Sequence, residues 1–95
     1  MYTIYVKFQC YPQKREAFLQ KMKDSGILAA IRAEDGCRKY DYYCSDEHPD
    51  ELLLVEFWES AQHQQVHMTQ PHMAQLKTFQ GEYIEKAALG EFTLL

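Results

Sequence analysis

Glycine is scarce in this sequence, and its scarcity removes the commonest nucleotide-binding sites. Only four of the 95 residues are glycine. None of them belongs to a Gly-rich loop of the type that cradles a dinucleotide or a phosphate group. We therefore expect no flavin or nucleotide cofactor.

Cysteine, basic clusters and long apolar runs are also rare or missing. Cys10, Cys37 and Cys44 are odd in number and lack metal-type spacing, which favours free thiols in a reducing cytoplasm over a disulfide or a nucleophilic cysteine. No apolar run reaches the length of a membrane span, and the N-terminus lacks the pattern of a signal peptide. The net charge is −4 without a basic stripe, so we expect a cytoplasmic protein with no nucleic-acid or membrane partner.

Alternating apolar and polar residues predict four strands. The clearest is residues 2–10. A Tyr-rich segment at 37–44 and an apolar segment at 51–58 form a hairpin, because the polar turn between them contains a proline that cannot continue a strand. An alternating segment at 86–95 is the fourth.

The stretch 52–72, LLLVEFWESAQHQQVHMTQPH, holds most of the side chains that are able to do chemistry. On a strand, Glu56 and Trp58 share one mostly apolar face, and the opposite face is apolar too. A carboxylate on such a covered face needs a partner or a raised pKa. Ser60 is a good N-cap, and a short helix after it would fold back and bring His67 toward Trp58 and Glu56.

Helical segments fill the intervals between the strands. We predict helix over 13–33 with a break at Asp24-Ser25-Gly26, a short helix over 61–68 and another over 70–80, with Thr69 as its cap and Pro71 in its first turn. The resulting order, β-α-β-β-α-β, is that of an α+β, ferredoxin-like fold with a four-stranded antiparallel sheet. A chain of 95 residues makes one domain, 1–95.

The sheet of this fold has one face without helices. In this sequence that face would carry Tyr5, Leu53, Val55 and Phe57. A large exposed apolar patch usually marks an association surface, so we expect a homodimer packed through its sheet faces.

The residues at 55–60 (VEFWES), followed by His67 and by 70–73 (QPHM), resemble the signature of the antibiotic biosynthesis monooxygenase (ABM) family. The turn at 34–37 (EDGC) before a Tyr-rich strand and the aromatic first strand ending near Pro12 add to the resemblance, which covers nearly the whole chain. The motif E-x-W-x-S with a later His and Pro-His is fairly specific for the family, but it does not select one activity within it.

This resemblance implies a dimeric α/β barrel with one pocket per subunit between sheet and helices. Family members include cofactor-free monooxygenases acting on quinols and polycyclic phenols, an isomerase acting on a phosphorylated autoinducer dione, and haem-degrading enzymes. The positions that match residues lining or flanking the family pocket are Glu56, Trp58, His67 and His72. The haem-degrading branch carries an asparagine on the first strand near Val6 or Phe8, and the absence of asparagine from this sequence argues against haem degradation.

His67 is the leading candidate for a catalytic base, because imidazole titrates near neutrality and can take a phenolic or enolic proton. The alternative is a histidine that only packs its helix onto the sheet. Trp58 would stack on a planar substrate or fill the core, and Glu56 would act as acid or base, orient His67, or form a structural salt bridge. Further candidates for binding substrate, all of which have a packing role as their alternative, are His72, Tyr40, Tyr42 and Tyr83.

His63 and His67 are four residues apart and would share one helix face, an arrangement that occurs in metal sites. No carboxylate or cysteine is evidently placed as a third ligand, so the sequence predicts no metal.

The function that these observations favour is a cofactor-independent monooxygenase that oxidises a small quinol or phenol with O2. One alternative is an isomerase or related proton-transfer enzyme acting on a small phosphorylated dicarbonyl, with the same His67 and Glu56 moving a proton. Another is a non-catalytic dimer that binds a small hydrophobic compound.

Overall fold

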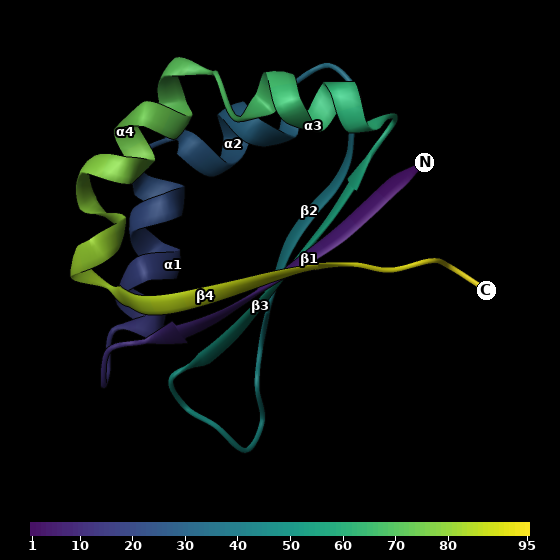
Figure 1. Ribbon diagram of the computed structural model, residues 1–95. Coiled ribbons are helices and arrows are strands. Elements are labelled where there is room, and N and C mark those ends of the chain that lie inside the picture. The colour runs from purple at the N-terminus through teal and green to yellow at the C-terminus, as the bar shows by residue number, and fades with distance from the viewer.

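One twisted sheet of four antiparallel strands is covered on a single face by helices (Figure 1). The computed structural model describes all 95 residues. In chain order its elements are β1 (Tyr2–Cys10), α1 (Arg15–Asp24), α2 (Ile27–Arg32), β2 (Cys37–Cys44), β3 (Glu51–Trp58), α3 (Ala61–His67), α4 (Pro71–Phe79), the 3-10 helix η1 (Gln80–Glu82) and β4 (Ile84–Glu91).

The strand order in the sheet is β2-β3-β1-β4, and every pairing is antiparallel. This arrangement confirms the α+β, ferredoxin-like fold expected from the sequence. The strands at 37–44 and 51–58 have the bounds that the alternation predicted. The first helical segment breaks between Asp24 and Ile27, where Gly26 adopts φ of +79°, a conformation that side chains with a Cβ rarely tolerate.

Two details differ from the sequence prediction. β4 begins earlier than expected, at Ile84, and ends at Glu91. Phe92 stays beside β1, because its amide donates to the Thr3 carbonyl and its carbonyl accepts from the Thr3 hydroxyl. Thr69 does not cap α4. Its hydroxyl donates to the Val66 carbonyl at the end of α3, and Gln70 is the N-cap, followed by Pro71 in the first turn as expected.

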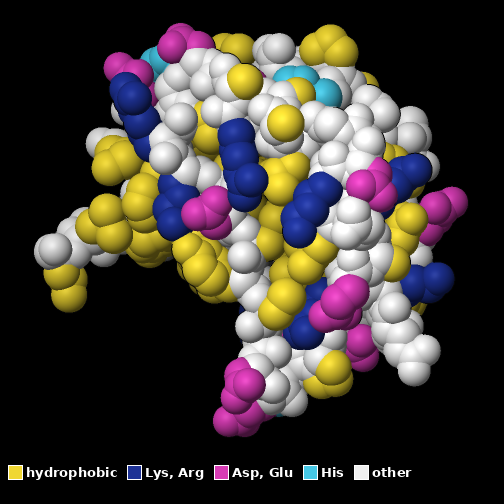
Figure 2. Space-filling view, turned by 180° about the vertical axis from the view of Figure 1, so that it is seen from behind, with side chains coloured by type: hydrophobic (Ala, Val, Ile, Leu, Met, Phe, Trp, Pro, Cys, Tyr) yellow, Lys and Arg dark blue, Asp and Glu magenta, His cyan; other side chains and the backbone are white.

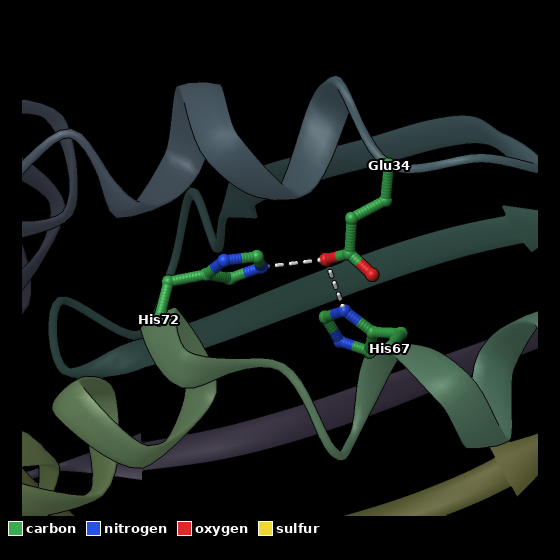
Figure 3. A group of neighbouring side chains, drawn as sticks. All are labelled: Glu34, His67 and His72. Carbon is green, nitrogen blue, oxygen red and sulfur yellow. Dashed lines mark hydrogen bonds and ion pairs between the residues drawn. The ribbon is translucent and has the colours of Figure 1, made fainter.

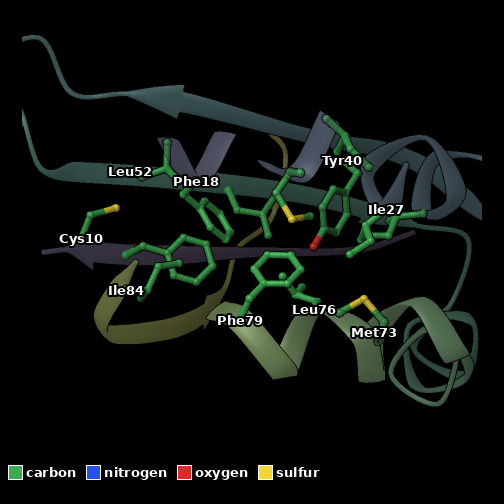
Figure 4. Packing of buried hydrophobic residues seen from close by; sticks show 14 of the residues in the cluster. Cys10, Phe18, Ile27, Tyr40, Leu52, Met73, Leu76, Phe79 and Ile84 are labelled. Atoms are coloured by element: carbon green, nitrogen blue, oxygen red, sulfur yellow. The ribbon is translucent and has the colours of Figure 1, made fainter. Parts of the chain in front are cut away.

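The core lies between the helices and the covered sheet face (Figure 4). Phe18 and Met22 from α1, Ile27 and Ile31 from α2 and Trp58 from β3 have no exposed surface. The three cysteines are free thiols. No helix of the structure has both the length and the apolar character that crossing a membrane demands.

The other sheet face is exposed and partly apolar. Tyr5, Tyr43 and Leu53 on it are 37%, 47% and 36% exposed, and Val55 and Phe57 are half-buried. Seen from behind, the molecule shows hydrophobic side chains between basic and acidic ones (Figure 2). We call Tyr5, Tyr43, Leu53, Val55 and Phe57 the outer face. Four of these residues, all except Tyr43, are those that the sequence predicted for the sheet face without helices.

Candidate active site

A cavity of about 280 Å³ lies between the sheet and helices α3 and α4. Its lining is mostly apolar, with a few polar groups and no lysine or arginine, as is typical of sites for small organic ligands. Met68 and Leu89 are 44% and 62% exposed, so the mouth of the cavity lies where α3 ends opposite β4. The lining residues are Val6, Phe8, Tyr40, Tyr42, Leu54, Glu56, Gln64, His67, Met68, Met73, Leu76, Gln80, Ala87 and Leu89.

Glu56 is the acidic group of this cavity. It is 4% exposed, and the period of the strand directs it to the covered face together with Trp58. The indole Nε1 of Trp58 donates to Glu56 Oε1 at 2.9 Å. Burial raises the pKa of Glu56 to about 7, although the Trp58 hydrogen bond lowers it and the charge of Glu34 raises it. Glu56 therefore exchanges a proton near neutral pH.

His67 is the basic group of the cavity, and the local sequence brings it there. The Ser60 hydroxyl caps α3 by accepting from the His63 amide, and the helix then runs back across the end of β3. The His67 ring lies 4.7 Å from the Trp58 ring and 5.7 Å from the Tyr40 ring, measured between centroids. The approach of His67 to Trp58 that the sequence predicted is confirmed.

Glu34 fixes the orientation of the His67 ring (Figure 3). The Nδ1 atom of His67 lies 2.7 Å from Glu34 Oε2. Because a carboxylate can only accept, Nδ1 carries the proton, and Nε2 of the neutral ring keeps its lone pair. Burial lowers the pKa of His67, and its bond to Glu34 opposes that shift. The result is an oriented, neutral imidazole with a free basic nitrogen.

Tyr40 and Tyr42 complete the polar lining. Both come from β2, and their rings meet edge to face with centroids 6.0 Å apart. Burial raises the pKa of both phenols above the usual value. They therefore remain protonated at neutral pH, so that a hydroxyl of this pair can donate a hydrogen bond to an oxygen of a bound molecule.

The structure thus brings four of the predicted site residues to the cavity and leaves three outside it. Trp58 is fully buried behind the wall, where it contacts His67 and Glu56. Tyr83 is half-buried and packs against Phe18 and Phe79 at the edge of the core. His72 lies beside Glu34, with its Nε2 atom 2.7 Å from Oε2. The residues that do line the cavity are His67, Glu56, Tyr40 and Tyr42.

The partner of His67 was missed by sequence reasoning. The predicted orientation of His67 by Glu56 is wrong, because the imidazole pairs with Glu34 and Glu56 pairs with Trp58. Gly36 allows the turn that carries Glu34, with φ of +80° and the His63 ring so close that a Cβ would overlap it. In the folded chain β2 begins at Cys37, opposite Trp58, and this pairing, which the sequence does not reveal, brings the preceding turn close to His67.

Comparisons with known proteins agree with this architecture. The family model described as antibiotic biosynthesis monooxygenase matches residues 1–78. The structure of Rv0793 from Mycobacterium tuberculosis is 30% identical, with a TM-score of 0.81 over 99% of this chain and 94% of that one. PA3566 from Pseudomonas aeruginosa is 18% identical, with a TM-score of 0.85 over 99% and 93% of the two chains. No curated protein matches the sequence.

A further solved structure, named as an antibiotic biosynthesis monooxygenase, is 14% identical to this chain. Its TM-score is 0.84 over 100% of this chain and 99% of that one. Identities of 14% to that monooxygenase structure and 18% to the Pseudomonas protein are low, so these two similarities establish the fold alone.

Proposed function

Because the chain belongs to the antibiotic biosynthesis monooxygenase family, we propose that it is a monooxygenase that oxidises a small quinol or phenol with O2. The observation that carries this proposal is the oriented imidazole of His67 in a mostly apolar cavity. A phenol is the kind of substrate that such a site activates, since removing its proton makes the ring electron-rich.

The first step is removal of the phenolic proton by His67. Its Nε2 atom accepts the proton, and the Glu34 carboxylate at Nδ1 stabilises the imidazolium that forms. In this step Tyr40 or Tyr42, which line the cavity, would donate a hydrogen bond to an oxygen of the substrate. Glu56, with its pKa of about 7, is the second group able to give or take a proton in the cavity.

The second step is reaction of the phenolate with O2. A carbon of the ring forms a bond to O2, and the resulting peroxide takes back the proton held by His67 to give a hydroperoxide. The O–O bond then breaks, and the outer OH leaves as water with the hydrogen of that carbon, which leaves a quinone. One oxygen atom ends in the product and the other in water, and the substrate supplies the electrons. The apolar walls from Leu54, Met73 and Leu76 limit the access of water to the intermediate.

A proton-transfer enzyme is the second candidate, because His67 and Glu56 together can move a proton beside a carbonyl group. The cavity offers no lysine or arginine for a phosphate group, which disfavours the phosphorylated dicarbonyl considered from the sequence. A non-catalytic dimer that binds a small hydrophobic compound is the third candidate. This candidate predicts that neither the wild type nor a His67→Ala variant turns over the ligand, and that the variant retains the affinity of the wild type.

Oxygen consumption by chelator-treated protein, measured with a panel of quinols and naphthols, tests the proposal. Uptake that depends on His67 and survives chelation supports it. Binding of these compounds without uptake favours the third candidate, and exchange of substrate protons with solvent without uptake favours the second.

Glu34→Gln is expected to lower kcat about 10- to 100-fold with little change in KM. The amide keeps a hydrogen-bond acceptor for Nδ1 of His67 but loses the charge that stabilises the imidazolium, and removing such a supporting group typically has an effect of this size. Asp35→Asn is the matched control, because this neighbouring side chain is 96% exposed. Equal losses in the two variants would contradict the role given to Glu34.

We further propose that two chains associate through the outer face. Leu53→Glu is expected to weaken the dimer at least about 100-fold, equivalent to about 3 kcal/mol, because it places a charge in a closely packed apolar contact. Sedimentation should give twice the 11.2 kDa chain mass for the wild type and the chain mass for the variant. Val66→Glu, at a side chain 58% exposed on α3, is the control. A monomeric wild type would refute the interface.

A further inference from the structure

Three side chains able to bind a metal converge at one point behind the cavity (Figure 3). Glu34 follows α2, His67 ends α3 and His72 lies in the first turn of α4. Both His67 Nδ1 and His72 Nε2 lie 2.7 Å from Glu34 Oε2. One ligand atom from each of the three residues lies within 4.8 Å of the other two.

Two imidazole nitrogens and a carboxylate oxygen form a donor set that suits zinc and neighbouring divalent transition metals. Bonds of about 2.0–2.2 Å to a tetrahedral zinc ion place its ligand atoms roughly 3.4 Å apart, which small rotations of these three side chains would reach. The ion pairs of Glu34 are with His67 and His72 alone. No lysine or arginine therefore competes with a cation for this carboxylate.

The cluster also has an aqueous side. Glu34 lines a surface hollow of about 340 Å³, whereas His67 lines the inner cavity. The hollow gives an ion a path to Glu34 and gives water a place from which to complete the coordination. The other residues lining the hollow are Asp35, Gln62, His63, Val66 and Gln70.

We propose that Glu34, His67 and His72 form a binding site for a divalent transition-metal cation of the zinc class. The pair His63 and His67, which the sequence offers at helical spacing, has no third ligand and is not this site. The structure instead places His63 against Ser60, with Nδ1 2.7 Å from the hydroxyl. Glu34 and His72 take the places beside His67.

Metal binding at this site would switch off the base, an effect that rests on the proposed function. In the hydrogen-bonded arrangement, Nδ1 of His67 carries the proton and Nε2 is the basic atom. A neutral imidazole that binds a metal through Nδ1 carries its proton on Nε2 instead. His67 then presents a donor to the cavity and cannot accept a phenolic proton, so zinc should inhibit turnover.

The test is direct titration of untagged, chelator-treated protein with Zn²⁺ by calorimetry and with Co²⁺ by visible absorption. We expect one ion per chain, with a Kd of micromolar order or tighter, and the absorption bands of four-coordinate Co²⁺. His72→Ala and Glu34→Gln should each weaken binding at least 10-fold, whereas His63→Ala, which changes a histidine in the same hollow, should alter it less than twofold. His72→Gln serves if His72→Ala does not fold.

Absence of stoichiometric binding, or affinity that falls with His63→Ala and not with His72→Ala, would overturn the site. Because the titrations contain no substrate, they decide the metal site even if no quinol proves to be oxidised. Zinc that binds as expected without inhibiting an active wild-type enzyme would refute the switch of His67.

Discussion

His67→Ala is expected to lower kcat/KM for quinol-dependent oxygen uptake by about 10²- to 10⁴-fold, the usual contribution of a positioned general base. The substitution removes the oriented imidazole and leaves Glu56, whose Oε1 atom already accepts from Trp58, as the remaining proton acceptor in the cavity. His67 is 1% exposed, so circular dichroism and thermal unfolding should accompany the kinetics to show that the variant folds.

His63→Ala is the matched control for this loss. His63 lies on the same helix but contacts Ser60 and lines the outer hollow. It should retain kcat/KM within about threefold. A stronger control is the pH profile: uptake by His67→Ala should rise steadily with pH as the free phenol ionises in solution. A folded His67→Ala enzyme with wild-type activity at pH 7 would show that His67 is a packing residue.

Glu56→Gln is expected to stabilise the protein at alkaline pH and to have a much smaller effect in acid. The pKa of Glu56 is raised from 4.5 to about 7, first of all by burial. The folded protein therefore binds a proton more tightly than the unfolded chain, and stability falls as pH rises from about 4.5 through about 7. The amide retains an oxygen to accept from Trp58 Nε1 but never ionises.

The difference in unfolding free energy between Glu56→Gln and wild type should therefore grow by about 2.5 kcal/mol between pH 5 and pH 8.5. Urea unfolding of both proteins at the two pH values measures it. Titration of His67 acts on both proteins and largely cancels in the comparison. If the difference in unfolding free energy does not change with pH, Glu56 has an ordinary pKa. That result would contradict its role as a proton-transfer group.

Local patterns in the sequence predict much of the fold and half of the site. Alternation defined β2 and β3, and Ser60 marked the start of the helix that carries His67 to Trp58. Both predictions depend only on residues that are close in the sequence. Within one strand or helix, the spacing of residues determines which face of the element a side chain occupies.

The remainder of the site depends on contacts between distant segments. Glu34 meets His67 across 33 residues and His72 across 38, through a turn whose geometry Gly36 permits. Trp58 lies in the core and not in the cavity because His67 of α3 packs against its ring. The apolar periodicity of the strand does not predict how that helix packs. The role of Glu34 therefore became visible only in three dimensions.

Isotope labelling tests the central claim most directly. Chelator-treated protein would be supplied with ¹⁸O2 and with a quinol or naphthol that supports oxygen uptake. The mass of the product would be measured by mass spectrometry. We predict one ¹⁸O atom in the quinone, with the second appearing in water. Product formed without label, or no uptake with any member of the panel while substrate protons exchange with solvent, would contradict the assignment as a monooxygenase.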